Sequence, residues 1–346
     1  MVKKAQMQCV YCREIKVYPC EFSKEHVISQ LLGIFGADTM TLLDSVCANC
    51  NDFFSKHLEI YLGRDSVFGI LYRSLAGIIR PDAFEKSIKH KRSRIEPSIR
   101  HSDHGALLVD IMLNTNKNFD VVIANQILMH NSTKGVRLHF RPSQLPYRRN
   151  LEDVGLRPVS RYMSFFSQAD NISRYVKEFN YALDKSEIKF QVSDQQFQQF
   201  RLQNNVEPLI FKSVIDDNIQ RALAKIVFNY FVHQYPRALV YSDSFSQITR
   251  FIRYGHKAER YLMIMDYKPI ISDIREIHGD EYSKHKIYIS QDPISNHIIG
   301  DMLLFNKIYI RVILSRDYPI IGIPALGSVF DINEKKVIGI NRCIAA

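Results

Sequence analysis

The pairs Cys9-Val-Tyr-Cys12 and Cys47-Ala-Asn-Cys50 decide the fold of the first part of this 346-residue chain. Each pair holds two thiols two residues apart, and a tight turn of that length can aim both thiolates at one metal ion. Two such turns complete the tetrahedral shell of four sulfurs that zinc prefers, with no position left open for chemistry. The pairs therefore predict a structural zinc ion that stabilises a small N-terminal module.

A redox-active dithiol is the alternative interpretation of a C-x2-C pair. That chemistry needs only one pair, in a βαβ setting that the sequence does not show. Six cysteines are also too few for a disulfide scaffold in a chain of this length. Charged side chains interrupt the densest apolar stretch, residues 298–314, so it does not read as a membrane span. We therefore expect a cytoplasmic protein with reduced thiols and no membrane association.

The composition favours a polyanionic partner. Lys and Arg number 46 against 36 Asp and Glu, which gives a formal net charge of +10. This balance is typical of proteins that bind nucleic acid, although it does not by itself separate DNA from RNA or from a membrane surface. A hydrophobic content of 46% is enough to build a core and argues against disorder, collagen and coiled coil.

The pattern along the chain predicts three parts: a cysteine-bearing module at 1–63, a basic helical connector at 64–105, and a larger domain at 106–346 for substrate, partner or sensing. Strand-like and helix-like stretches occur in blocks and not in regular βαβ alternation, which favours the α+β class. The strand-like stretches are 107–113, 121–124, 308–314 and 337–340, and the helix-like ones are 67–79, 215–232 and 245–254.

The connector carries a dense run of cations between residues 86 and 100. Such a run could contact phosphates along a nucleic-acid backbone, or it could be a solvated basic linker. Arg221 and Lys225, on the expected helix 215–232, have the same two interpretations. The connector residues that we predict to bind nucleic acid are Lys86, Lys89, Lys91, Arg92 and Arg94.

Two further motifs lie beside the cysteine pairs. Glu25-His26 offers a hard oxygen ligand and a general base at adjacent positions, although such a dipeptide is more often a solvated pair. Asn51 directly follows the second pair, in the first turn of a helix that is expected to begin there. Its side-chain carbonyl could face a cation held by Glu25, or the residue could simply cap the helix. Ser55 and Glu59 follow at steps of four, on the helix face of Asn51.

Taken in order, these motifs resemble the HNH endonuclease superfamily, in its zinc-knuckle branch of ββα-metal nucleases. The resemblance covers residues 9–59 and implies a finger of two strands and one helix that hydrolyses phosphodiester bonds with one divalent ion, Mg²⁺ or Mn²⁺. By position, His26 matches the histidine that deprotonates the attacking water, and Glu25 and Asn51 match the ligands of the divalent ion. The structural zinc shell would be Cys9, Cys12, Cys47 and Cys50.

The sequence departs from the family pattern at three places. The middle asparagine has no evident counterpart, and Asp44 is the candidate turn residue that would steady the His26 loop. Glu25 stands where many relatives have an aspartate, which gives the carboxylate a longer arm. His57 is a second candidate ligand, but its offset of six residues from Asn51 would put it on another face of a helix.

The resemblance implies a metal-dependent endonuclease that acts on DNA, by nicking or by double-strand cleavage. In bacteria such proteins serve antiviral defence or the restriction of foreign DNA. The alternatives are a zinc-knuckle protein that binds nucleic acid without cutting it, and an RNA-directed nuclease. Because one finger cuts one strand, double-strand cleavage would call for a homodimer. An operon-encoded protein is the other candidate partner.

Overall fold

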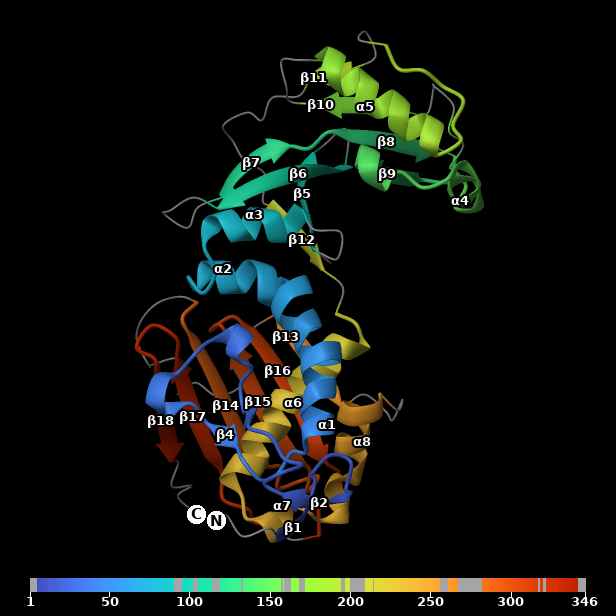
Figure 1. Cartoon of the computed structure of the whole chain (residues 1–346). Helices are drawn as coiled ribbons and strands as arrows, with labels where there is room; N and C mark the ends of the chain where they lie inside the picture. The colour runs from blue at the N-terminus through green and yellow to red at the C-terminus, as the bar shows by residue number, and fades with distance from the viewer. Residues whose placement is uncertain are drawn as a thin grey trace. The chain divides into compact units, whose positions relative to one another are not determined.

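The chain forms two compact units, residues 1–93 together with 214–346, and residues 94–213 (Figure 1). This division differs from the predicted boundaries at 63 and 105, because the cysteine-bearing module shares one hydrophobic core with the C-terminal part of the chain. The computed structural model describes residues 5–89, 95–101, 105–113, 119–131, 133–156, 158, 163–167, 172–193, 197–199, 209–213, 215–255, 261–266, 282–316, 318–319 and 322–341.

The first unit begins with two small antiparallel sheets, each of two strands. The first sheet is a hairpin whose turn holds Cys9 and Cys12, and the second carries Glu25 and His26. A short helix then starts at the second cysteine pair. These elements are β1 (Ala5–Gln8), β2 (Ile15–Tyr18), β3 (Glu25–His26), the 3₁₀ turns η1 (Gln30–Leu32) and η2 (Gly36–Asp38), β4 (Thr41–Leu42) and α1 (Ala48–Phe54).

After Phe54 the helical stretch widens into π-helical turns, which are rare and often mark functional sites. It breaks at Ser66, which is extended (φ −99°, ψ 169°) and whose Oγ donates to the Leu62 carbonyl at 2.5 Å. The helix expected over 67–79 is therefore present only in part, and Pro81 begins a new helix. The elements are η3 (Ser55–Glu59), η4 (Tyr61–Asp65), η5 (Phe68–Tyr72), α2 (Arg73–Leu75) and α3 (Pro81–Lys89).

The C-terminal part of this unit is an antiparallel sheet of six strands in the order β13-β16-β15-β14-β17-β18, with helices beside it. The helices expected over 215–232 and 245–254 and the strands expected over 308–314 and 337–340 are confirmed. The elements are α6 (Asp217–Gln234), α7 (Arg237–Val240), η9 (Asp243–Phe245), α8 (Ser246–Tyr254), β13 (Leu262–Asp266), β14 (Lys284–Gln291), β15 (Ile298–Leu304), β16 (Ile308–Ser315), β17 (Leu326–Asp331) and β18 (Lys336–Asn341).

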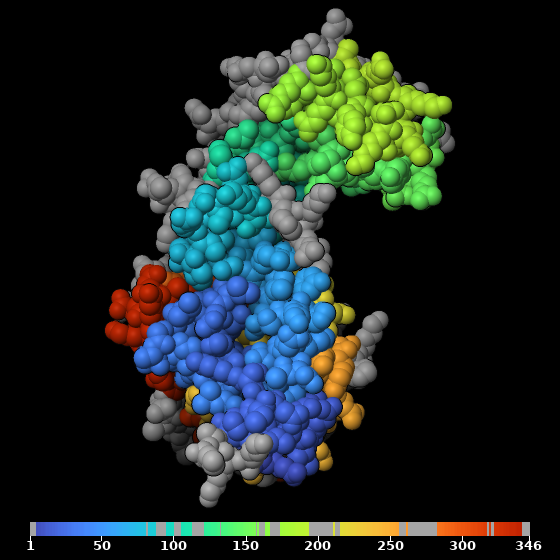
Figure 2. All heavy atoms as spheres, in the orientation of Figure 1, coloured from blue at the N-terminus to red at the C-terminus, as the bar shows by residue number. Residues whose placement is uncertain are grey.

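Helix α6 is the centre of this unit. One side packs on β14, β15 and β16, and another contacts β4, η3 and η4 from the N-terminal part (Figure 1). Figure 2 shows the N-terminal residues, in blue, covering most of this helix. The predicted apolar face is buried, but burial extends around the helix to polar side chains as well: Arg221, Lys225 and Asn229.

Close approach of α6 to the sheet depends on Gly300 in β15. A Cβ atom at this position would lie 2.1 Å from Cγ1 of Val227, so the two elements could not pack as they do. We expect Gly300→Ala to lower the free energy of unfolding by about 1–3 kcal/mol and the thermal midpoint by about 2–10 °C. Gly339→Ala in β18 is the matched control, because a Cβ there meets nothing within 4 Å. Equal midpoints for both variants would contradict this packing, and Val227→Ala should restore the Gly300 variant.

The described residues of the second unit form one antiparallel sheet, one mixed sheet and two α-helices. One sheet has the strand order β12-β5-β6-β7 and the other β11-β10-β8-β9, in which β10 and β11 are parallel. The strands expected over 107–113 and 121–124 are confirmed. The elements are β5 (Ile95–His101), β6 (Gly105–Leu113), β7 (Phe119–Ile123), β8 (Gln126–Asn131), β9 (Val136–Phe140), η6 (Pro142–Gln144), α4 (Arg148–Asp153), β10 (Met163–Ser167), α5 (Ile172–Lys185), β11 (Phe197–Gln199) and β12 (Leu209–Ser213).

Across the described ranges, no helix combines the length and the hydropathy needed to cross a bilayer. The apolar stretch 298–314 forms strands β15 and β16 of the six-stranded sheet.

Candidate metal centre and the polar cluster beside it

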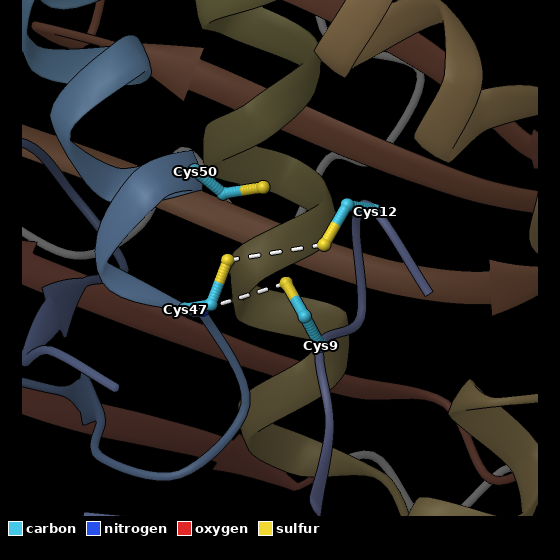
Figure 3. Close-up of side chains that lie close together, drawn as sticks. All are labelled: Cys9, Cys12, Cys47 and Cys50. Atoms are coloured by element: carbon cyan, nitrogen blue, oxygen red, sulfur yellow. Dashed lines mark hydrogen bonds between the residues drawn. The ribbon is translucent and has the colours of Figure 1, made fainter. Parts of the chain in front are cut away.

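The four cysteines of the two pairs converge on one point. Their Sγ atoms all lie within 4.8 Å of one another, as ligands of a single ion would (Figure 3). Sγ of Cys12 lies 3.8 Å from Sγ of Cys47, and the backbone N–H of Cys47 donates to Sγ of Cys9 at 3.4 Å. Four thiols at this separation fit the tetrahedral sulfur shell of zinc. The cluster could therefore bind a metal ion such as zinc.

Local structure explains why the thiols meet. The first pair sits in the turn of the β1–β2 hairpin, which Arg13 closes in a left-handed conformation (φ 62°). In the second pair, Cys47 is the residue before α1 and Cys50 lies in its first turn. Mutual hydrogen bonds among the thiols lower the pKa of Cys9 and Cys47, towards the thiolate that metals bind, and raise the pKa of Cys12 and Cys50. Cys20 is exposed and apart from this cluster, and Cys343 lies outside the described residues.

Glu25 turns into the core beside this cluster. Its side chain is only 2% exposed, and its Oε1 lies 2.5 Å from Nζ of Lys225 on α6. The same ammonium also lies 2.5 Å from Oε1 of Glu59, so one buried cation serves two carboxylates. Glu25 is therefore not half of a solvated pair, and Lys225 is neither solvated nor able to reach a phosphate. Both sequence-based alternatives for Lys225 are wrong.

The charges of this cluster depend on one another. Burial raises the pKa of the Glu25 carboxyl, against the opposing effect of Lys225. Burial alone would lower the pKa of Lys225, but the carboxylates of Glu25 and Glu59 outweigh it and raise that pKa. Lys225 is therefore charged at neutral pH and holds a negative partner. Removal of Lys225 would leave the buried Glu25 carboxylate without its cation, and such an uncompensated charge typically costs about 3–5 kcal/mol.

Asn229, one helical turn after Lys225, joins three elements. Its Nδ2 donates to Oε1 of Glu25 and to the backbone carbonyl of His26, each at 3.0 Å. Its Oδ1 accepts a hydrogen bond of 2.5 Å from the hydroxyl of Tyr11, which lies between the cysteines of the first pair. A carboxylate and a carbonyl can only accept, so these partners fix the orientation of the amide.

His26 differs from Glu25 in being partly exposed. Its Nε2 lies 3.1 Å from Nε2 of Gln30, an amide donor that would pair with an unprotonated ring nitrogen. Burial lowers the pKa of His26, with further lowering by Lys24 and Lys225. This lowering of the pKa, which Glu59 partly opposes, favours the neutral ring that can take up a proton.

Asn51 lies inside α1 and not at its cap, which is Cys47, so the capping interpretation is wrong. Its Nδ2 donates to Oγ of Ser23 at 2.8 Å and to the backbone carbonyl of Lys24 at 3.1 Å. These bonds hold the segment that leads into Glu25 and His26. The helix widens after Phe54, and Glu59, further along it, contacts Lys225.

The remaining sequence-based candidates lie elsewhere. Asp44 accepts from Oγ of Ser45 and faces Arg237 at 3.6 Å, so its contacts do not steady the His26 loop. His57 is exposed and stacks on Phe53, with ring centroids 4.9 Å apart.

The cations considered as nucleic-acid contacts differ in their exposure to solvent. Lys86 is exposed on α3, which ends at Lys89. Arg221 is 8% exposed and donates to the carbonyls of Ile252 and Arg253, so it is neither solvated nor placed to contact phosphate. Three of the predicted contacts lie outside the described residues: Lys91, Arg92 and Arg94.

The sequence did not identify Lys225, Asn229 or Tyr11 as neighbours of Glu25 and His26. The signal that could have found two of them is a row of polar residues at steps of four, at positions 221, 225 and 229, on an otherwise apolar helix. Comparisons with protein families, with curated proteins and with solved structures gave no match for this chain.

Proposed function

We propose that this protein is a metal-dependent HNH endonuclease that hydrolyses phosphodiester bonds of DNA, with His26 as the general base. The observation that carries the proposal is the position of the partly exposed His26 imidazole, whose lowered pKa favours its neutral form. His26 lies on β3, which pairs with β4, and α1 follows these two strands and begins at the second cysteine pair. This order of elements agrees with the finger that the resemblance implies. The four-cysteine cluster would hold zinc in a structural role.

In the proposed reaction, Nε2 of His26 takes a proton from a water molecule, whose oxygen attacks phosphorus while the bond to the leaving oxygen breaks; the leaving oxygen keeps the bonding electron pair and takes a proton from solvent. A neutral imidazole suits this step because its unperturbed pKa lies near ~6.5 and the surroundings of His26 lower it further. Gln30, which donates to Nε2, would orient the ring until water replaces it. A divalent ion, Mg²⁺ or Mn²⁺, would supply charge stabilisation for the phosphate when bound.

Glu25 does not fit the ligand role as it is placed. Its carboxylate is buried and already interacts with Lys225 and Asn229, and Asn51 contacts Ser23 and the Lys24 backbone. A divalent ion at Glu25 would have to exchange with the Lys225 ammonium. The proposal that Glu25 and Asn51 bind the ion therefore needs its own test, separate from that of His26.

The function is tested with the full chain on supercoiled plasmid, single-stranded DNA and structured RNA, each with Mg²⁺, with Mn²⁺ and with EDTA. We expect nicked or linear plasmid only when a divalent ion is present. Cleavage of RNA alone would support the RNA-directed nuclease. Retention of all three nucleic acids without cleavage would support the zinc-knuckle binding protein.

The role of Glu25 is tested by the double variant Glu25→Gln/Lys225→Met, which removes Lys225 together with the charge of its more deeply buried carboxylate partner and leaves only the partly exposed Glu59 carboxylate without its cation. Lys225→Met alone should destabilise the fold, whereas the double variant should recover most of that loss. If Glu25 binds the ion, the double variant loses divalent-dependent cleavage by about 100-fold or more. Cleavage at the rate of the unmodified protein would remove Glu25 from the ligand set.

The matched control replaces another buried pair of the same unit, Lys284 and Asp331, whose charged atoms lie 3.1 Å apart on the sheet. Lys284→Met/Asp331→Asn should leave the cleavage rate unchanged.

Further parts of the proposal concern the cellular location, the biological role and the partners of the protein. A role in antiviral defence or restriction follows from the resemblance, and a cytoplasmic location follows from the free thiols. A homodimer is proposed for double-strand cleavage because one finger cuts one strand, and an operon-encoded protein is the other candidate partner. The exposed Lys86 supports a phosphate contact at α3. Lys86→Ala should therefore reduce the slope of log affinity against log salt by about 1.

A further inference from the structure

The feature that the proposed function does not use is Asn229, a side chain with no exposure to solvent that touches both Glu25 and the backbone of His26. Helix α6 brings it from a position about 200 residues further along the chain. Its three hydrogen bonds use both amide hydrogens and the carbonyl oxygen, so its hydrogen-bonding capacity is close to saturated.

Strand β3 needs this support because it is very short. It pairs with β4 only through Glu25 with Leu42 and His26 with Thr41. The carbonyl of His26 instead receives a hydrogen bond from Asn229, while the N–H of Val27 donates to the Met40 carbonyl at 3.0 Å. The direction of the His26 side chain therefore depends on a contact from outside the N-terminal module.

Tyr11 supports Asn229 from the opposite side. The phenol is 1% exposed, and its ring packs edge-on against Phe54 and Phe228, with centroids 4.6 and 5.6 Å away. Among the described residues, its hydroxyl donates to Oδ1 of Asn229. Because Tyr11 lies between Cys9 and Cys12, the same row of contacts runs from the cysteine cluster through Asn229 to His26.

We propose that Asn229, held by Tyr11, is a positioning residue that fixes the Glu25–His26 strand for cleavage, so that helix α6 completes the catalytic site. This inference rests on the proposed function for its effect on rate, although the contact itself does not. Neither side chain can touch the substrate, since both are buried. Any effect on the chemical step must therefore act through His26 or Glu25.

The test measures steady-state cleavage of plasmid by the full chain with Asn229→Leu and with Tyr11→Phe. We expect Asn229→Leu to lower kcat about 10- to 100-fold, because a small misplacement of a catalytic group is costly, with KM within about twofold. Tyr11→Phe removes one hydroxyl and should lower kcat about 3- to 10-fold. Gln220→Ala, on the same helix and away from the site, is the control and should change neither constant.

Hydrogen–deuterium exchange of the same proteins, without substrate or divalent ion, reports the contact directly. We expect faster exchange of the Val27 amide in Asn229→Leu and no change in Gln220→Ala. Unchanged exchange would overturn the positioning role even if the unmodified protein cuts no nucleic acid.

If the unmodified protein cuts, kcat within twofold in both variants would overturn the role while the nuclease function stands. Should Asn229→Leu fail to fold, Tyr11→Phe carries the test, and an unchanged kcat there would overturn the proposal.

Discussion

His26→Ala is expected to abolish divalent-dependent cleavage of plasmid DNA, with a loss of about 10³-fold in kcat. A general base contributes about 10²–10⁴-fold, and no second histidine lies beside His26 among its described contacts to replace it. The imidazole is partly exposed and its hydrogen-bond partner among the described residues is Gln30, so its removal should not destabilise the fold. A loss of cleavage rate with an unchanged thermal midpoint would distinguish a catalytic role of His26 from a role in stability.

The measurement needs three readings on the same protein: cleavage rate, retention of plasmid in a gel-shift assay, and thermal midpoint. His57→Ala is the matched control, because His57 is an exposed histidine that stacks on Phe53. We expect that variant to cut at the rate of the unmodified protein. A His26→Ala protein that cuts as fast as His57→Ala would exclude His26 as the base.

Loss of the metal at the four-cysteine cluster is expected to unfold the N-terminal part of the first unit. Cys9, Cys47 and Cys50 belong to the buried core that this part shares with α6 and the sheet. Structural zinc in small modules contributes about 10–16 kcal/mol of apparent binding free energy, which becomes folding free energy when no site exists in the unfolded chain. Cys50→Ser should therefore lose about one zinc per chain and lower the thermal midpoint by more than about 10 °C.

The zinc content of purified protein is measured by elemental analysis, beside thermal unfolding with and without a chelator. Cys20→Ser is the control, because Cys20 is exposed and is not part of the cluster. Equal zinc content and equal midpoints for Cys50→Ser and Cys20→Ser would contradict a structural metal. Since Tyr11 lies within the first pair, loss of zinc should also disturb its bond to Asn229 and reduce cleavage.

Features that depend on local spacing were predictable from the sequence. The two C-x2-C pairs indicated the thiol cluster, and apolar periodicity indicated α6 and strand β16 within a few residues. The break at Ser66 was not predictable, because no proline or glycine marks it and a side-chain hydrogen bond to Leu62 accompanies it. The division of the chain was also missed, because packing of the small module on α6 is a long-range contact.

The contacts of the candidate site were likewise not predictable from local sequence patterns. Glu25 and His26 were recognisable as a motif, but the motif alone implied an open carboxylate. The partner of that carboxylate, Lys225, lies 200 residues away in sequence, and no local pattern specifies such a contact. The sequence thus indicates which residues could bind an ion or take up a proton, and the structure shows that the Glu25 carboxylate already contacts Lys225 and Asn229.

The late position of α6 has a consequence for synthesis of the protein. A ribosome adds about 5–20 residues per second, so about 10–30 s separate Glu59 from Asn229 in the growing chain. During that interval the Glu25 carboxylate lacks its ammonium partner and the His26 strand lacks its amide support. A chain that ends before α6 would carry every residue of the HNH-like motif and still lack the contacts that order it, so the proposed activity is expected only after α6 has been synthesised.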